Sequence, residues 1–356
     1  MSRYLLAGGG TAGHVNPLLA LADEIMLTKS NRVFALGTKE GLESKLVPEK
    51  GYPLLFVPRL PMPRKPNLYA FKFLFLFKQS VEQVKRYLIE EKIDVVVGFG
   101  GYASAPAYKA AKDLRIPYVV HEANAMPGYA NKVGAKNASA VAVTFRSSDL
   151  PNSVLTGMPL RKEIVELTTS NKKSAAIKHF GFSAKAPILL VTGGSLGAKR
   201  INDTIEQARP FLAQAGIQVL HIVGERSGLT EFAAEGYKRM VYCDRMDLAI
   251  ASADLAVARS GAATVAEFAA VGLPAVFVPY PVGNGEQEFN AMDLVNGQAA
   301  LLVKDAEFNL DYMKNKVIPL ISATHTLKEM KENALKLGNS DGAARLLELV
   351  NTVIKS

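Results

Sequence analysis

The sequence lacks several features that would place it in a particular class of protein. Its 356 residues include one cysteine, Cys243, and no tryptophan. A single cysteine excludes internal disulfides and fits a reducing compartment. No apolar run reaches the roughly 20 residues that a membrane span needs. The expected first strand, residues 4–7, follows no charged-then-apolar leader, so we expect no secretory signal.

What the chain does have is length, hydrophobic residues and positive charge. Its hydrophobic content of 49% over 356 residues suffices for large cores and favours two domains. Its formal net charge is +9. Such an excess could serve nucleic acid, an anionic membrane surface or an anionic substrate, and its location decides between them.

Part of the charge lies in residues 59–86, where Glu82 is the only acid. The basic residues there are Arg59, Arg64, Lys65, Lys72, Lys78, Lys85 and Arg86. Among them is an aromatic run containing Phe71, Lys72, Phe73, Phe75, Phe77 and Lys78. On a helix these side chains point all around, which is typical either of a core helix or of a segment lodged in a membrane surface.

The prolines that flank this aromatic run favour an exposed position. Pro61, Pro63 and Pro66 stand among the basic residues, as in an exposed loop. Phenylalanines can then dip into an anionic membrane surface while lysines reach head groups. Nucleic-acid modules more often carry stacking aromatics on a sheet, so we expect no nucleic acid as partner.

A glycine-rich turn follows the first expected strand. Gly8-x-Gly10-x-x-Gly13 matches the dinucleotide-binding fingerprint, and we expect Asn16 to cap the following helix with Pro17 at its first position. The fingerprint also needs an acid at the end of the second strand. That strand, residues 32–36, ends in Gly37-Thr38-Lys39, which disfavours NAD.

His14 is the unusual residue of this turn. A histidine in a phosphate-binding turn can act as a base, as a donor to an oxyanion or as a plain structural donor. The setting favours a functional role for His14.

Short apolar runs alternate with helical stretches along the first half, which predicts a doubly wound parallel sheet. One expected strand is followed by the turn Gly98–Tyr102 and the next by His121-Glu122-Ala123-Asn124. Ligands bind at the carboxyl ends of strands in open α/β sheets. Glu122 and Asn124 are therefore candidates to meet a substrate, although either could instead cap the next helix.

The opening pattern repeats after a polar, lysine-rich stretch, residues 167–187, that we interpret as a domain boundary. Residues 188–198 again read as strand, glycine turn and helix, with Ser195 able to donate to a phosphate. We expect two Rossmann-like domains, 1–162 and 163–340, facing across a ligand-binding cleft. Residues 341–356 form an expected amphipathic helix, predicted to pack back on the first domain.

A second nucleotide-binding signal lies at residues 254–267. An apolar strand, 255–258, ends in Ser260-Gly261, and a helix starts at Ala262. Free N–H groups at such a helix N-terminus attract phosphate, and Glu267 could accept hydrogen bonds from a ribose diol. The alternative is an ordinary turn with a solvated Glu267. Further on, Gln287 and Asn290 could bind sugar hydroxyls.

Four ordered motifs resemble the MurG family of bacterial peptidoglycan glycosyltransferases, which has the GT-B fold. They are Gly9–His14, His121–Asn124, Gly193–Ala198 and Arg259–Glu267. The resemblance covers nearly the whole chain. It implies inverting transfer of N-acetylglucosamine (GlcNAc) from UDP-GlcNAc to the C4 hydroxyl of the muramoyl sugar of lipid I, which is undecaprenyl-linked. The product is lipid II, and the expected location is the cytoplasmic face of the cell membrane.

The resemblance also assigns residues. Its UDP-GlcNAc contacts fall on Thr11, Ala12, Gly13, Asn124, Arg161, Ser195, Cys243 (through its backbone), Ala262, Ala263, Thr264, Val265, Ala266, Glu267 and Gln287. Its acceptor-diphosphate contacts fall on Gly10, Gly100, Gly101 and Tyr102. Ala12 stands where many members have glycine, and Glu286 where a second glutamine is common. Cell-wall synthesis proteins are possible partners.

The expected chemistry needs a base and a way to stabilise a leaving diphosphate. The sequence has no Asp-x-Asp pair of the kind that holds a metal on a nucleotide sugar, so we expect neither metal nor cofactor. Helix N-termini, Ser195 and Arg161 could stabilise the diphosphate instead. Our hypothesis is that His14 deprotonates the acceptor or binds its diphosphate. The alternative is a UDP-GlcNAc 2-epimerase of the same fold.

Overall fold

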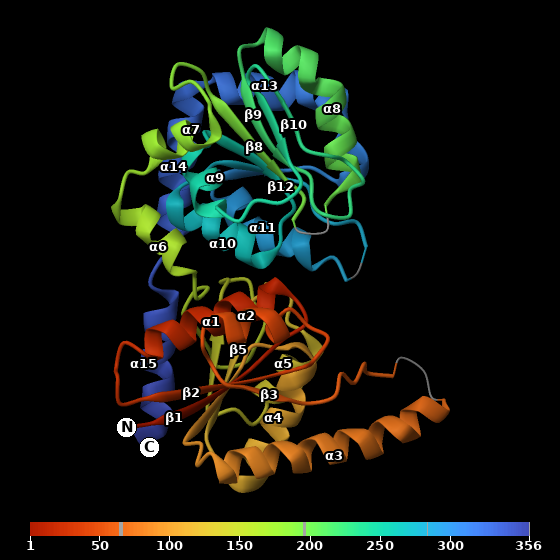
Figure 1. Cartoon of the computed structure of the whole chain (residues 1–356), viewed down its shortest axis with the longest axis vertical. Helices are drawn as coiled ribbons and strands as arrows, with labels where there is room; N and C mark the ends of the chain where they lie inside the picture. Colours follow the sequence, from red (N-terminus) through yellow and green to blue (C-terminus); the bar gives the residue numbers. More distant parts are fainter. Residues whose placement is uncertain (64–66, 195–196, 283, 356) are drawn as a thin grey trace. The chain divides into compact units, whose positions relative to one another are not determined.

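The computed structural model describes residues 1–63, 67–194, 197–282 and 284–355. The chain divides into two compact units. Unit 1 comprises Met1–Arg161 and Asp341–Ser356, and unit 2 comprises Lys162–Ser340. Each unit has a seven-stranded sheet with helices packed against it (Figure 1). The prediction of two α/β domains with parallel sheets is therefore confirmed.

Unit 1 is wholly parallel in its described strands. Its sheet has the order β3-β2-β1-β4-β5-β6-β7. The strands are β1 (Arg3–Ala7), β2 (Arg32–Gly37), β3 (Leu54–Phe56), β4 (Val95–Gly98), β5 (Tyr118–Glu122), β6 (Ala140–Val143) and β7 (Ser153–Leu155). The helices are α1 (Ala12–Ile25), α2 (Glu43–Glu49), α3 (Leu68–Glu90), α4 (Gly101–Leu114), α5 (Tyr129–Ala135) and α15 (Gly342–Lys355).

Both faces of the unit 1 sheet are buried, which explains the continuous apolar strands. Tyr4 and Leu6 of β1 belong to one core with α1 and α15, while Leu5 and Ala7 belong to the other core with α3 and α4. Successive side chains of a strand alternate between faces. The last helix joins the first core through Leu346 and Val350, both fully buried, and Asn351 accepts a hydrogen bond from the Tyr4 hydroxyl at 3.1 Å.

The first helix begins earlier than the sequence indicates. Its N-cap is Thr11, so Asn16 and Pro17 lie inside it, and the expected start at Asn16 is wrong. The glycine turn accounts for this, because Gly10 adopts φ +91 and the extended Thr11 that follows is the N-cap, although its side chain makes no capping hydrogen bond. Pro17 is tolerated because it removes only the bond to the Gly13 carbonyl near the helix start.

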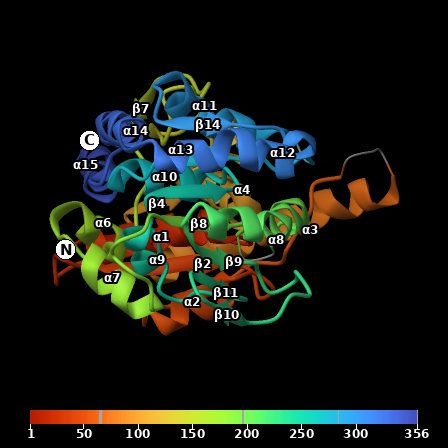
Figure 2. The same cartoon turned by 90° about the horizontal axis from the view of Figure 1, so that it is seen from above.

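Helix α3 exposes the aromatic run at its N-terminal half. Phe71 is 77% and Phe75 62% exposed, whereas Val81 and Val84 further along are buried. The alternative of a core helix over residues 71–78 is therefore wrong. Figures 1 and 2 both show this end of α3, drawn in orange, projecting beyond the unit 1 sheet. No helix in the described parts of the chain is long and apolar enough to cross a membrane.

Unit 2 repeats the architecture with one antiparallel pair. Its sheet has the order β10-β11-β9-β8-β12-β13-β14. The strands are β8 (Ile188–Thr192), β9 (Gln218–Ile222), β10 (Phe232–Ala234), β11 (Tyr237–Met240), β12 (Leu255–Ala258), β13 (Ala275–Phe277) and β14 (Ala300–Leu302). The α-helices are α6 (Lys162–Thr169), α7 (Lys173–Phe180), α8 (Lys199–Gln214), α9 (Met246–Ser252), α10 (Ala262–Val271), α11 (Glu286–Asn296), α12 (Leu310–Tyr312), α13 (Ile318–Ser322) and α14 (Thr324–Leu337).

Two parts of unit 2 differ from the sequence-based expectation. No hairpin was predicted, yet β11 pairs antiparallel with β10, because Gly236 at φ +68 allows a tight turn between the two strands. The exposed edge strand β10 carries no apolar alternation that would predict it. The polar stretch 167–187, interpreted as a domain boundary, lies inside unit 2, which begins at Lys162. Helix α7 lies within this stretch and buries Ala176, Ile177 and Phe180.

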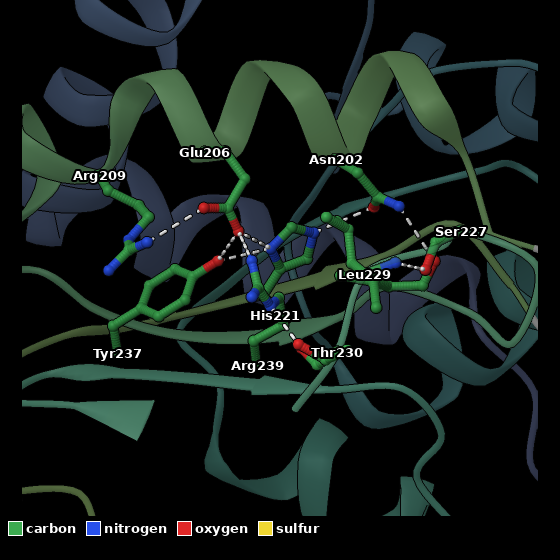
Figure 3. Close-up of polar contacts among 10 residues, drawn as sticks. Asn202, Glu206, Arg209, His221, Ser227, Leu229, Thr230, Tyr237 and Arg239 are labelled. Atoms are coloured by element: carbon green, nitrogen blue, oxygen red, sulfur yellow. Dashed lines mark hydrogen bonds and ion pairs between the residues drawn. The ribbon is translucent and has the colours of Figure 1, made fainter. Parts of the chain in front are cut away.

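A buried polar network lies on one side of the unit 2 sheet (Figure 3). His221 Nδ1 contacts the Tyr237 hydroxyl at 2.7 Å, and that hydroxyl donates to Glu206 at 2.8 Å. The same carboxylate receives Arg239 at 2.7 Å and Arg209 at 3.1 Å. This pairing offsets the cost of placing charge beside the core. No sequence motif indicated this network, whose members come from α8, β9 and β11.

Two fully buried histidines make stability depend on pH. Burial lowers the pKa of His121 in unit 1 and of His221 in unit 2 to about 4, from the ordinary 6.5. The unfolded chain therefore binds more protons below pH 6.5. Stability is full above that pH and falls as the pH drops toward 4, by up to about 3 kcal/mol per histidine.

We expect the thermal unfolding temperature to fall steeply between pH 6.5 and 4.5. His121→Asn or His221→Asn should flatten this dependence even though each lowers stability at neutral pH. His325→Asn is the control, because its side chain is 87% exposed. Scanning calorimetry across the pH range gives the measurement, and an unchanged slope in both buried variants would contradict the assignment.

Candidate active site

The chain reverses its winding direction at one point in each sheet, and the glycine turns lie there. In unit 1 the switch is between β1 and β4, and in unit 2 it is between β8 and β12. Crevices outside the carboxyl ends of strands at such switch points are the usual ligand sites of open α/β sheets. The four motifs identified in the sequence follow β1, β5, β8 and β12.

The loop after β1 orients His14. The Nδ1 atom of His14 lies 3.0 Å from the Gly9 carbonyl oxygen and 3.3 Å from the Thr11 hydroxyl. Since a carbonyl oxygen only accepts, Nδ1 donates its proton to Gly9. The Nε2 atom of a neutral His14 then carries the lone pair, which a general base requires. Thr11, Ala12 and Gly13 form the N-terminus of α1, where backbone N–H groups lack helical partners.

The turn after β4 packs against the same loop. Gly100 and Gly101 have φ values of +91 and +77, and a Cβ on Gly101 would lie 2.6 Å from the Gly9 carbonyl oxygen. Ser104 accepts the Gly100 N–H at 3.0 Å and donates to the Ala7 carbonyl at 2.8 Å. Of the residues predicted to contact the acceptor diphosphate, Gly101 and Tyr102 open α4 and offer helix N-terminal N–H groups.

Two other predicted donors in unit 1 are already used within the protein. The Gly10 N–H donates to the Glu43 carboxylate at 2.7 Å, and the Gly100 N–H donates to Ser104. Glu43, which is fully buried at the start of α2, was not predicted as part of this loop. Only the spacing of Gly9, Gly37 and Gly41 could have indicated it, since a side chain on any of them would clash with this carboxylate. An acid therefore does lie beside the end of β2, where the dinucleotide-binding fingerprint needs one. Its carboxylate, however, already accepts hydrogen bonds from the protein itself.

The loop after β5 leaves Asn124 partly exposed and uses the carboxylate of Glu122 for its own hydrogen bonds. Glu122 is 2% exposed, and its carboxylate accepts the N–H groups of Asn124 at 2.9 Å and Gly128 at 3.0 Å and the Asn131 amide at 2.9 Å. Glu122 thus braces the loop, and its candidacy as a substrate contact is wrong. Asn124 is half-buried on this brace, and Arg161 is half-buried at the end of the first segment of unit 1.

The loop after β8 depends on glycine contacts. Gly224 at φ +85 lies against the backbone of Gly197, and a Cβ on either residue would clash with the other loop. Asn202 of α8 donates to the Val223 carbonyl at 3.0 Å and contacts His221 Nε2 at 3.0 Å, which links this loop to the buried network of Figure 3. Ser195, predicted to contact UDP-GlcNAc, lies outside the described residues.

The turn after β12 leads directly into α10, whose N-cap is Gly261. Ala263 and Thr264 in the first turn are half-buried, whereas Ala262 and Val265 are buried, so those two can offer only backbone atoms to a ligand. Glu267 is 8% exposed, which excludes the alternative of a solvated side chain. Arg259 donates to the Val278 carbonyl at 3.0 Å and pairs with Asp305 at 2.6 Å, so it braces the turn.

Three remaining predictions fall in unit 2, one in the loop after β11 and two in α11. Cys243 is buried, which raises the pKa of its thiol to about 11. Its backbone N–H and C=O take part in none of the backbone–backbone hydrogen bonds found among the described loops and turns. Gln287 is half-buried and accepts the Tyr280 N–H at 3.0 Å, so its amide N–H₂ can donate. Asn290 is fully buried and donates to the Ser260 carbonyl, so its prediction as a sugar contact is wrong.

Comparison with known proteins now identifies the family. Residues 4–143 match the N-terminal domain of glycosyltransferase family 28, and residues 188–346 match its C-terminal domain. The chain belongs to glycosyltransferase family 28. Both matched regions contain a glycine turn at a switch point, so the family covers both candidate loops. The alternative of an NAD oxidoreductase is excluded.

Individual relatives also place the chain in this family. A protein of Clavibacter sepedonicus is 50% identical, over 100% of this chain and 98% of its own length. It is named UDP-N-acetylglucosamine–N-acetylmuramyl-(pentapeptide) pyrophosphoryl-undecaprenol N-acetylglucosamine transferase. The crystal structure of MurG from Acinetobacter baumannii superposes with a TM-score of 0.77 at 26% identity, covering 99% of this chain and 100% of that one. The resemblance to the MurG family and the GT-B fold are thus confirmed.

The epimerase alternative shares only the fold. The UDP-GlcNAc 2-epimerase of Neisseria meningitidis, solved with UDP-GlcNAc bound, superposes with a TM-score of 0.68 at 13% identity, covering 100% of both chains. Such low identity carries no activity across. The full-length relatives at 50% identity are transferases, and the epimerase hypothesis is abandoned.

The close contact between Gly101 and Gly9 predicts a selective loss of function. Gly101→Ala and Gly51→Ala each place a side chain at positive φ, +77 and +79, and each should cost about 1 kcal/mol of stability. Only Gly101→Ala also pushes against the Gly9 carbonyl, because Gly51 has open space around it. We expect turnover to fall at least about tenfold in Gly101→Ala alone, since small displacements of positioned groups are costly. Equal turnover in the two variants at matched stability would disprove this.

Proposed function

We propose that the chain transfers GlcNAc from UDP-GlcNAc to the C4 hydroxyl of the muramoyl sugar of undecaprenyl-diphospho-MurNAc-pentapeptide, giving lipid II and UDP. The enzyme is a UDP-GlcNAc-dependent N-acetylglucosaminyltransferase. The observation that carries this function is the 50% identity over the full chain to the Clavibacter transferase, with both family 28 domains present. The reaction builds peptidoglycan and so contributes to cell-wall growth.

The donor is bound, in this proposal, by the residues around α10 and the loop after β8. The N-terminus of α10 offers the N–H groups of Ala262, Ala263 and Thr264 to the diphosphate. Glu267 accepts hydrogen bonds from the ribose hydroxyls, and the backbone of Cys243 pairs with the uracil. Gln287 donates its amide to a sugar hydroxyl. The remaining proposed donor contacts, to Ser195, Arg161, Asn124 and Thr11–Gly13, rest on the family resemblance.

The acceptor is bound, in this proposal, at the start of α4 and activated by His14. The N–H groups of Gly101 and Tyr102 bind its diphosphate, and the Arg59 guanidinium, 5.2 Å from the Tyr102 ring, adds positive charge. Gly10 and Gly100 support this site through their φ angles of +91 rather than through their N–H groups, which are already used.

The chemical step is a single displacement. The C4 hydroxyl oxygen attacks C1 of GlcNAc and forms the new glycosidic bond while the bond from C1 to the UDP oxygen breaks. The hydroxyl proton goes to Nε2 of His14, and the electron pair leaves with UDP, whose new charge lies at helix N-terminal N–H groups. Attack opposite to the leaving group inverts the configuration at C1.

We expect UDP release from UDP-GlcNAc to depend on a short-chain lipid I analogue and to persist in EDTA. His14→Ala should lower turnover about 10²–10⁴-fold, because it removes the base, while leaving UDP-GlcNAc binding nearly intact. His325→Ala, which changes an exposed histidine, is the control. Wild-type turnover in His14→Ala would exclude the base role, and acceptor-independent release would contradict the transferase assignment.

The exposed end of α3 supports a peripheral position at an anionic membrane surface. Leu68, Phe71, Leu74 and Phe75 are exposed at helical spacing, and Lys72 and Lys78 are exposed beside them. Phe73 stacks on Phe77 at 5.8 Å between ring centroids, on the partly buried side of the helix. We propose that the four exposed apolar side chains, Leu68, Phe71, Leu74 and Phe75, enter the lipid interface. They would bring the enzyme to its lipid-linked acceptor at the cytoplasmic face.

Phe71→Ser combined with Phe75→Ser should lower partitioning onto phosphatidylcholine–phosphatidylglycerol vesicles about tenfold or more. Ile89→Ser is the matched control, because Ile89 is 62% exposed at the other end of the same helix. High salt should weaken binding of the wild type, because screening weakens the attraction of lysines to head groups. Vesicle sedimentation measures both, and equal losses in the two variants would contradict this surface assignment.

A further inference from the structure

One peptide unit connects two ionisable side chains on opposite sides of the first glycine loop. The Gly10 N–H donates to Glu43 Oε2 at 2.7 Å. The Gly9 carbonyl, which belongs to the same peptide unit, accepts from His14 Nδ1 at 3.0 Å. Because a trans peptide is planar and points its C=O and N–H in opposite directions, fixing one group fixes the other. Glu43 thus determines where the Gly9 carbonyl points.

Hydrogen bonds and close packing fix the position of the Glu43 carboxylate. Its Oε1 accepts both the N–H and the hydroxyl of Thr38 at 2.8 Å, and the residue has no solvent exposure. Side chains at Gly9, Gly37 or Gly41 would clash with the carboxylate. Three hydrogen bonds to its two oxygens compensate for its burial. The first glycine loop is therefore built around a fixed anion.

This arrangement selects one tautomer of His14. A peptide whose N–H is fixed by Glu43 presents its carbonyl to Nδ1, and a carbonyl only accepts, so the proton lies on Nδ1. The lone pair then lies on Nε2. Neutral histidine in water favours the other tautomer, with the proton on Nε2, which leaves Nε2 unable to accept a proton.

We propose that Glu43 is a positioning residue for glycosyl transfer, which acts through the Gly9–Gly10 peptide to keep Nε2 of His14 unprotonated. Glu43 touches no substrate in this scheme. The inference rests on the proposed role of His14 as the base. It assigns a catalytic purpose to a carboxylate that would otherwise only stabilise a loop.

Glu43→Gln is the informative substitution, because it keeps the shape of the side chain. Glutamine has one oxygen, so its N–H₂ must face the N–H of either Gly10 or Thr38, and one of these bonds is lost. We expect part of the His14 population to move its proton to Nε2. We expect kcat to fall about 10–100-fold, the size of effect seen when a partner that orients a metal-bound histidine is lost, with little change in KM for UDP-GlcNAc.

The test combines ¹⁵N-histidine NMR of the full-length protein with kinetics. The His14 signals are assigned by their loss in His14→Ala, and the nitrogen shifts report which atom carries the proton. Glu49→Gln, an exposed change on the same helix, is the control and should alter neither readout. Thr38→Val removes one hydrogen bond to Oε1 but keeps the Gly10 bond, so it should lower stability with a much smaller loss of kcat.

The outcomes separate this inference from the base assignment. A tautomer change with a fall in kcat in Glu43→Gln, absent at matched stability in Thr38→Val, supports the inference. An unchanged tautomer, or equal losses of kcat in Glu43→Gln and Thr38→Val, would overturn it. A tautomer change without loss of kcat, together with an active His14→Ala, would overturn the base assignment and this inference with it.

Discussion

Both candidate ligand loops depend on backbone meeting backbone at a distance that only glycine permits. In unit 1, Gly101 lies against the Gly9 carbonyl, and in unit 2, Gly224 lies against Gly197. Each contact joins the loop after the first strand of a unit to the loop after a neighbouring strand. Glycine loses more backbone freedom on folding than any other residue, so each contact has an entropic cost that the close packing of the two loops must offset. The contacts hold these glycines beside the helix starts that carry the candidate N–H donors.

Buried carboxylates fix the loops that the glycines bring together. Glu43 anchors the loop after β1, and Glu122 anchors the loop after β5. Both accept hydrogen bonds from main-chain N–H groups. Glu267, on α10, is the acid we assign to the ligand in the proposed function. All three residues are at most 8% exposed, so burial alone does not distinguish a bracing acid from a binding acid.

The sequence predicts strands and turns, which have local patterns. It fails where a residue's role depends on contacts with residues far away in the chain. Apolar runs and glycine turns predicted both sheets and the switch-point loops, because parallel strands and their turns have local signals. The start of α1 was missed because the turn at Gly10, with φ +91, places the N-cap at Thr11 rather than at Asn16. Glu43 was missed because Gly10, the residue that it connects to the site, is 33 residues away in the chain and adjacent to it only in the fold. Asn290 reads as a binding residue in sequence, yet burial makes it structural.

The exposed end of α3 has an energetic cost that the fold does not offset. Leaving Phe71 and Phe75 in water forgoes about 1.5–3 kcal/mol each relative to burial, while the same helix buries Val81, Val84 and Leu88. A helix end that extended beyond the core and met only water would expose polar residues at these positions. In the proposed function, the acceptor is carried on an undecaprenyl chain that stays at the membrane, and an apolar helix end flanked by lysines would bring the enzyme to it. Under this proposal the exposed patch serves substrate capture, which gives a reason for its energetic cost.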